Sequence, residues 1–114
     1  MNGVVDEWEA RWRKGTLPVA ILAVLRRGPM HGYAIAAALR DLLGAAVPEG
    51  TLYPLLNSFD QDGLAASVWA TQEKGPARKT YSLTRKGRSI LNQAERSWRE
   101  FNADLERLFD DAVD

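Results

Sequence analysis

The chain has 114 residues, a formal net charge of zero from 15 basic and 15 acidic side chains, and a hydrophobic content of 46%. This length and composition predict one globular domain and argue against disorder. The chain has no Cys and a single His, so disulfides and the common metal and Ser–His catalytic arrangements are excluded within one chain. We expect that the protein is not an enzyme and binds no cofactor. The chain carries neither an apolar run of membrane-spanning length nor a signal-peptide pattern, so we expect a cytoplasmic protein with no membrane partner.

Periodic apolar residues predict two helices at the start of the chain. Residues 4–14 form an amphipathic helix whose apolar face carries Trp8 and Trp12. Thr16 is expected to cap a second helix that extends to residue 27. Because that helix is apolar on most sides, we assign it to the core.

Two further helices follow. Residues 31–43 carry an apolar stripe that includes Tyr33, which we expect to be buried. Residues 49–62 contain a fourth helix. Pro54 lacks an N–H and is unfavourable inside a helix, so this helix is expected to begin near Thr51 or to bend there.

After the fourth helix the sequence pattern changes from helical periodicity to β-forming residues. Residues 64–71 and 78–83 are rich in β-forming residues and flank a Gly-Pro turn, which predicts a hairpin. Thr84 is expected to cap a last helix that runs to about residue 111.

The order of these elements predicts a mainly α fold with a small β-hairpin, namely a winged helix-turn-helix plus a C-terminal dimerisation helix. We divide the chain into an N-terminal helix at the dimer interface (residues 1–15), a winged DNA-binding domain (residues 16–84) and the dimerisation helix (residues 85–114).

Charge is distributed unevenly along the chain. Residues 41–73 contain no Lys or Arg, whereas residues 74–88 contain six and no acidic residue. Lys74, Arg78 and Lys79 belong to the hairpin, and a basic hairpin beside a helix-turn-helix favours contact with DNA phosphates. The alternative is that these cations only solvate an exposed turn.

The fourth helix would be the recognition helix, although it has no cation. It would use Thr51, Tyr53 and Asn57, because hydroxyls contact phosphate and Asn pairs with adenine. Specificity from so few donors would be modest or would depend on DNA shape.

Apolar residues of the last helix are spaced alternately three and four positions apart, which is a heptad pattern. These residues are Leu91, Ala94, Trp98, Phe101, Leu105, Leu108 and Ala112. Packing on the chain's own domain accounts for the first two. The remainder predicts the seam of a homodimer, which would place two recognition helices about one DNA turn apart.

Large aromatic residues interrupt this seam. Trp98 and Phe101 pack poorly in a narrow two-stranded coil, and Trp8 and Trp12 are candidates to pack against them. The cluster is either solid core between subunits, which the residues alone favour, or a flat apolar cavity for a planar ligand.

Three motifs in order carry a family resemblance. They are HGYAI at residues 31–35, GTLYPLL at residues 50–56 and GPARKTYSLTRKG at residues 75–87. With them the chain resembles the PadR-like transcriptional regulators nearly end to end. Its short C-terminal helix is similar to that of the small subfamily, which includes multidrug-sensing repressors.

The resemblance implies a cytoplasmic homodimer that binds double-stranded promoter DNA, usually represses, and is often released by a small aromatic or drug-like effector. Thr51, Tyr53 and the basic wing match DNA-contacting positions of the family. Tyr33 matches a position near the DNA backbone, with a core hydroxyl as the alternative. Trp98 resembles the interface tryptophan on which planar drugs stack.

Two further points follow from the motifs. His31 is expected to cap the third helix rather than to contact a ligand. Ser58-Phe59-Asp60 replaces the basic residue and Leu-Glu pair of the family, which weakens phosphate contact from the recognition helix. The alternative function is therefore a winged-helix ligand-sensing or protein-interaction module that does not bind DNA.

Overall fold

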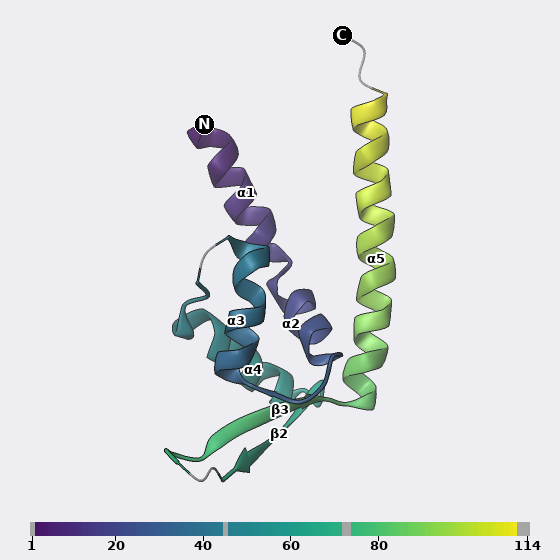
Figure 1. Cartoon of the computed structure of the whole chain (residues 1–114). Coiled ribbons are helices and arrows are strands. Elements are labelled where there is room, and N and C mark those ends of the chain that lie inside the picture. The colour runs from purple at the N-terminus through teal and green to yellow at the C-terminus, as the bar shows by residue number, and fades with distance from the viewer. Residues whose placement is uncertain (1, 45, 72–73, 112–114) are drawn as a thin grey trace.

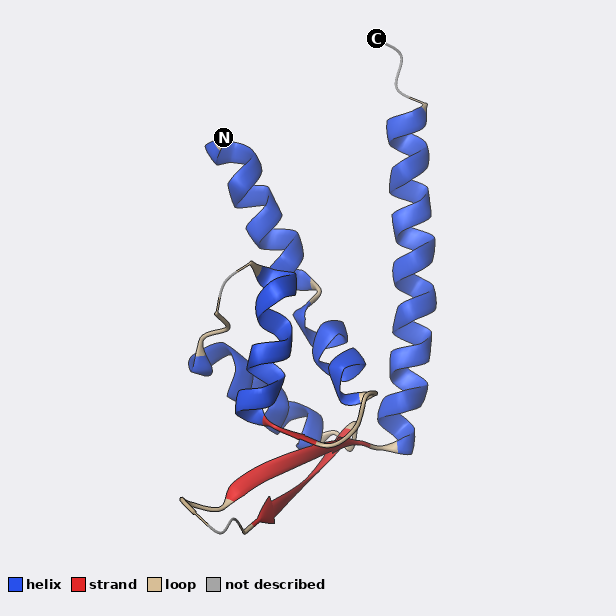
Figure 2. Ribbon diagram, viewed as in Figure 1, coloured by secondary structure: helices blue, strands red, loops and turns tan. Residues whose placement is uncertain are grey.

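The computed structural model describes residues 2–44, 46–71 and 74–111. A helical unit lies above a short β-sheet, and the first and last helices project from it as two arms (Figure 1). Figure 2 shows that the hairpin extends below the helices as a wing. In chain order the elements are α1 (Gly3–Gly15), α2 (Leu17–Leu25), β1 (Met30–His31), α3 (Gly32–Leu43), α4 (Glu49–Gln61), β2 (Ala65–Ala70), β3 (Arg78–Leu83) and α5 (Arg85–Asp110).

The sheet confirms the predicted hairpin and adds one strand. Its order is β1-β3-β2, with both neighbouring pairs antiparallel. Trp69 lies opposite Lys79 in the hairpin, and Met30 lies opposite Tyr81 on the other edge of β3. The sequence did not predict β1, because two residues show no periodicity. The result is the expected mainly helical winged fold.

The core lies between α2, α3, α4, the sheet and the first turns of α5. Side chains that are at most 3% exposed come from every one of these layers, whereas α1 has no buried residue. They are Leu17, Ile21, Leu22, Leu25, Ile35, Leu39, Leu52, Leu56, Ala65, Tyr81 and Leu91. The uniformly apolar α2 is therefore the central helix, as predicted.

Two of the predicted helix caps are confirmed. His31 precedes α3 and its Nδ1 accepts a hydrogen bond from the Ala34 amide at 3.2 Å. Thr84 precedes α5 and its hydroxyl accepts from the Gly87 amide at 2.9 Å. Each satisfies a first-turn N–H that has no partner within the helix.

The prediction that Thr16 caps the second helix is wrong, and Thr51 does not cap the fourth helix. Thr16 has helical backbone angles, and its hydroxyl donates to the Arg13 carbonyl of α1 instead of capping α2. The fourth helix begins at Glu49, after Pro48, so Thr51 lies within its first turn and Pro54 lies inside the helix. Pro48 accepts backbone hydrogen bonds from the amides of the first turn, which starts the helix without Thr51.

Gly87 allows α5 to begin close against the turn that follows α4. A Cβ at this position would overlap the backbone carbonyl of Leu64. A backbone oxygen cannot turn away as a flexible side chain does, so only glycine fits here.

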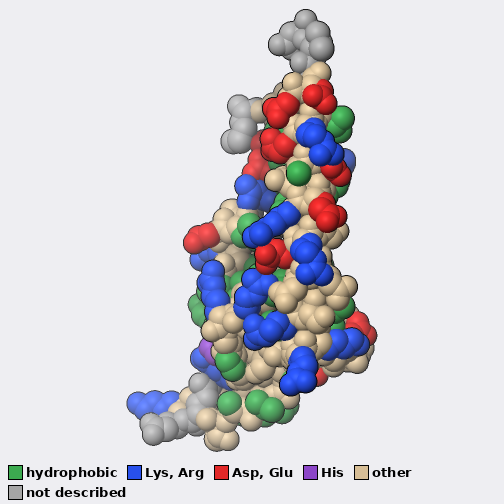
Figure 3. Space-filling model, turned by 90° about the vertical axis from the view of Figure 1, so that its right-hand side faces the viewer, with side chains coloured by type: hydrophobic (Ala, Val, Ile, Leu, Met, Phe, Trp, Pro, Cys, Tyr) green, Lys and Arg blue, Asp and Glu red, His purple; other side chains and the backbone are tan. Residues whose placement is uncertain are grey.

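The two arms expose apolar side chains. Trp8 and Trp12 of α1 are 53% and 55% exposed, and Phe101 and Leu108 of α5 are 59% and 68% exposed. Ala112, the last residue of the predicted seam, lies outside the described residues. Figure 3 shows acidic side chains gathered along the upper part of α5, away from the wing.

Within the described ranges, none of the helices has the length and apolar character needed to cross a membrane.

Candidate nucleic-acid interface

A groove of about 550 Å³ brings together the start of α3, one face of α4 and the hairpin. Five of the seven residues that we expected to contact DNA line it: Tyr33, Tyr53, Asn57, Arg78 and Lys79. Segments far apart in the sequence therefore form one surface. None of the residues that line this groove is acidic, so its electrostatic character is set by the two cations.

The helix α4 presents its polar face to this groove. Tyr53 and Asn57 are four residues apart and therefore lie one turn apart on the same side of the helix. Leu52, Leu56 and Phe59 occupy the adjacent side of the helix and are buried. Burial of this apolar stripe orients the polar face outward.

Thr51 is not part of the groove. It lines a separate depression with residues of α1 and α2, among them Lys14 and Leu17. Lys74 is also outside the groove, as an exposed residue of the connection between β2 and β3.

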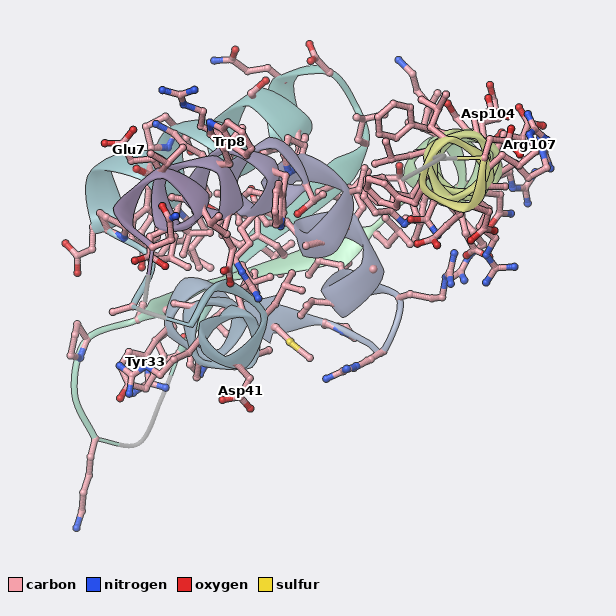
Figure 4. The ribbon with its side chains drawn as sticks, turned by 90° about the horizontal axis from the view of Figure 1, so that it is seen from above. Glu7, Trp8, Tyr33, Asp41, Asp104 and Arg107 are labelled. Atoms are coloured by element: carbon pink, nitrogen blue, oxygen red, sulfur yellow. The ribbon has the colours of Figure 1, made fainter. Side chains whose placement is uncertain are left out.

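Tyr33 is the main departure from the expected burial pattern. It is 77% exposed, so the prediction that it belongs to the buried stripe of α3 is wrong. Figure 4 shows Tyr33 at the side of the molecule opposite to α5. Its ring stacks against that of His31 with the centroids 6.3 Å apart. The first turn of α3 lies at the edge of the core, which leaves this position facing solvent.

Gly32 lets α3 and α4 approach each other at the groove. A Cβ at this position would come within 2.7 Å of the Tyr53 ring. The glycine of the first motif and the tyrosine of the second motif are therefore in direct contact. This packing holds Tyr53 at the groove, where it is 38% exposed.

The wing is attached to α4 by a polar contact. The Ser67 hydroxyl of β2 donates to the Asp60 carboxylate of α4. Phe59 is buried beside it at 7% exposure. The Phe-Asp pair that departs from the family pattern thus serves packing and wing attachment in this chain.

Tyr81 anchors β3 beneath the cations. It is 2% exposed, and burial raises the pKa of its hydroxyl, with the charges of Asp60 and Tyr53 adding to the effect. Tyr81 therefore remains neutral at physiological pH. The Lys79 ammonium lies 5.7 Å from the centroid of its ring, within cation–π range.

Five residues that line the groove were not among the predicted contacts, and two of them, Trp69 and His31, adjoin the cations. Trp69 of β2 is 70% exposed, and the sequence suggested only a strand residue at this position. Its pairing opposite Lys79 puts it next to the predicted cations, which only the hairpin register reveals. His31 also lines the groove, and its Nε2 is 2.9 Å from Arg78 Nη1.

A second, apolar groove of about 430 Å³ lies between α1, α2, the end of α3 and α5. Trp12 and Trp98 line it, together with Val19, Ala20 and Leu42. Of the four aromatic residues predicted to surround an effector, Trp8 and Phe101 lie outside it. Phe101 is nevertheless beside Trp98, with ring centroids 6.2 Å apart.

Comparison with known proteins agrees with this geometry. The profile of the transcriptional regulator PadR-like family matches residues 21–93. A PadR family transcriptional regulator from Eggerthella lenta is 31% identical, with a TM-score of 0.86 over 96% of this chain and 95% of that chain. Bacillus subtilis PadR, solved in complex with operator DNA, is 29% identical, with a TM-score of 0.62 over 68% of this chain and 45% of that chain.

A curated relative is the uncharacterized 37.1 kDa protein in transposon TN4556 of Streptomyces fradiae. It is 32% identical over 101 residues, which make up 89% of this chain. This chain spans only 27% of the length of that protein. The family profile covers more than half of the present chain and its fold matches solved members. The chain therefore belongs to the PadR-like family of transcriptional regulators.

Proposed function

We propose that this PadR-family regulator binds double-stranded promoter DNA as a homodimer. We further propose that it acts as a repressor and is released by a planar aromatic effector bound at the dimer interface. The observation that carries the proposal is the groove in which Tyr33, Tyr53, Asn57, Arg78 and Lys79 converge. The Bacillus subtilis relative solved with operator DNA supports the same use of the fold.

The chemistry of the groove suits DNA. Arg78 and Lys79 are cations that neutralise phosphates, and Lys74 at the tip of the wing extends the basic surface along the backbone. The tyrosine hydroxyls position the helix on the backbone, and Asn57 is the residue of α4 suited to reading adenine in the major groove. Thr51 would contact the backbone at the start of α4, outside the groove.

The exposed arms support a homodimer. Trp98, Phe101, Leu105 and Leu108 of α5 are between 37% and 68% exposed although they follow a heptad pattern. An apolar seam of this length on an isolated subunit marks an association surface. A twofold axis through α5 would cover it on both subunits and present two wings to one duplex.

The apolar groove supports an effector site. Trp12 and Trp98 supply two large aromatic faces, each about half exposed, and a second subunit placed along α5 would border the same groove. Aromatic rings prefer to stack on planar ligands, which is why we assign this class of effector. Trp8 and Phe101 would contribute from its rim.

The DNA proposal is tested by mobility shift with two duplexes, the sequence upstream of the protein's own gene and a random sequence. If roughly six phosphates are neutralised per dimer, the logarithm of the affinity should fall with log salt at a slope of about −5. The double variant Arg78→Ala/Lys79→Ala should weaken binding to both duplexes and flatten this slope.

The matched control removes two cations far from the wing. Arg99→Ala/Arg107→Ala loses the same charge from the acidic part of α5 and should leave the slope unchanged. If the wild type binds neither duplex, the chain is the ligand-sensing or protein-interaction module instead. The absence of any cation from α4 is the observation that favours this second function.

The effector proposal is tested by tryptophan fluorescence. Ethidium, a planar aromatic cation, and phenol should quench the wild-type dimer, and Trp98→Ala should abolish the response. Trp69→Phe is the control, since Trp69 lies on the wing and should leave the quenching intact. An intact dimer that neither compound quenches would mean that the aromatic residues are plain core between subunits.

A further inference from the structure

The side chain of His31 has more hydrogen-bond donors around it than it can accept. Its Nδ1 accepts from the Ala34 amide at 3.2 Å. Its Nε2 lies 2.9 Å from Nη1 of Arg78. An amide and a guanidinium are both obligate donors, whereas a neutral imidazole has one acceptor nitrogen and one N–H. Only one of the two contacts can therefore be a hydrogen bond.

The hydrogen bond from the Ala34 amide to Nδ1 is the one that forms, because the two donors differ in their surroundings. The Ala34 amide is fixed in the first turn of α3, is partly shielded, and has no partner within the helix. Losing His31 as an acceptor would leave this N–H unsatisfied. Arg78 is exposed at the end of β3 and can turn its guanidinium toward water. The proton of His31 therefore sits on Nε2.

With this tautomer, two donors converge on one point of the groove. The Nε2–H of His31 and the guanidinium of Arg78 face each other at hydrogen-bond distance, and neither is an acceptor. The residues lining the groove include no carboxylate that could lie between them. An oxygen atom beside both donors can accept from each of them, and an anionic oxygen does so most strongly.

We infer that His31 and Arg78 form a two-donor site for one phosphate oxygen of the DNA backbone. This inference rests on the proposed DNA binding and adds a residue that no charge pattern reveals. Arg78 supplies the charge, and His31 supplies a neutral, fixed donor that is held in place by its own role as the cap of α3. The same contact would hold the first turn of α3 against the wing.

The tautomer itself is testable without DNA. His31 is the only histidine of the chain, so a long-range proton–nitrogen correlation spectrum contains one imidazole. We expect the proton on Nε2 in the neutral form at pH 8. A proton on Nδ1, with Nε2 accepting from Arg78, would overturn the inference.

Two substitutions separate the two roles of His31. His31→Asn keeps an acceptor near the position of Nδ1, and so keeps the cap, but has no group at the position of Nε2. His31→Gln places an amide N–H near the position of Nε2 but loses the cap. We expect H31N to keep its melting temperature and to bind both duplexes about tenfold more weakly per subunit. We expect H31Q to melt at a lower temperature and to bind within about twofold of wild type.

The salt dependence adds a further distinction. Loss of a neutral donor should leave the slope of log affinity against log salt unchanged in H31N, whereas R78A should flatten it by about one per subunit. H31N that binds both duplexes as tightly as wild type would overturn the phosphate site and leave the proposed DNA binding intact.

If the wild type binds no duplex, the site is tested with inorganic phosphate. Its addition should shift the Nε2 resonance of the wild type and not that of R78A. No shift in the wild type would overturn the site, whereas a shift would support it as an oxyanion site in a protein that does not bind DNA.

Discussion

Large apolar side chains are buried in the winged unit and exposed on the two arms. Leu56 and Ile35 of the winged unit are fully buried, whereas Phe101 and Leu108 of α5 are more than half exposed. The winged unit has closed its core within one chain. The arms have the apolar pattern of a core but no partner for it within the subunit.

This difference indicates which region can be stable within a single subunit. A small unit with a closed core can fold within one subunit, whereas an exposed apolar seam is typical of a surface through which subunits associate. Stability of the winged unit and assembly through the arms should therefore respond to different substitutions.

The largest expected effect concerns the core. Leu56→Ala should lower the free energy of unfolding by about 4 kcal/mol, because a fully buried leucine leaves a cavity when it is truncated. Thermal and urea unfolding at fixed protein concentration measure this loss. The matched variant Leu108→Ala should leave the helical signal of the folded subunit intact and weaken assembly instead. Equal loss of unfolding free energy in both variants at high dilution would erase the distinction between the two regions.

A charged residue introduced into the apolar seam of α5 tests whether subunits associate through it. Phe101→Asp should destabilise the proposed dimer by about 3 kcal/mol, because association would bury a carboxylate without a partner. Sedimentation over a range of concentrations should show a lone subunit that retains its circular dichroism spectrum. Asp104→Ala, a charge change on the same helix beside Arg107, is the control and should sediment as the wild type. A dimer that survives Phe101→Asp unchanged would mean that the subunits associate elsewhere.

The smallest expected effect concerns the two threonines at which the arms meet the winged unit. Thr84→Ala removes the cap of α5 and the hydrogen bond from its hydroxyl to the Gly63 carbonyl, and should cost about 1 kcal/mol. Thr16→Ala removes no N-cap of α2. It loses only the hydrogen bond from its hydroxyl to the Arg13 carbonyl, which the Thr16 amide also contacts, and should cost only about 0.3 kcal/mol. Melting temperatures measured side by side distinguish the two. Equal losses would contradict the assignment of the caps.

The local structure of this protein follows from its sequence. Apolar periodicity predicted the helices and the hairpin, and Thr84 predicted the start of α5, because each depends on residues within a few positions of one another. The same local logic failed at Thr16, because its hydroxyl donates to the Arg13 carbonyl of α1 instead of capping α2. The fourth helix starts at Glu49, where the Pro48 carbonyl accepts from the amides of the first turn.

The joining of distant segments was decided by the tertiary structure. Nothing in the spacing of residues placed β1 on the edge of β3, turned Tyr33 outward, or brought Trp69 and His31 to the basic groove. These outcomes depend on how α3, α4 and the sheet pack around their common core. Contacts between residues far apart in the chain leave no periodic signal, whereas burial of the core fixes their geometry once the elements meet.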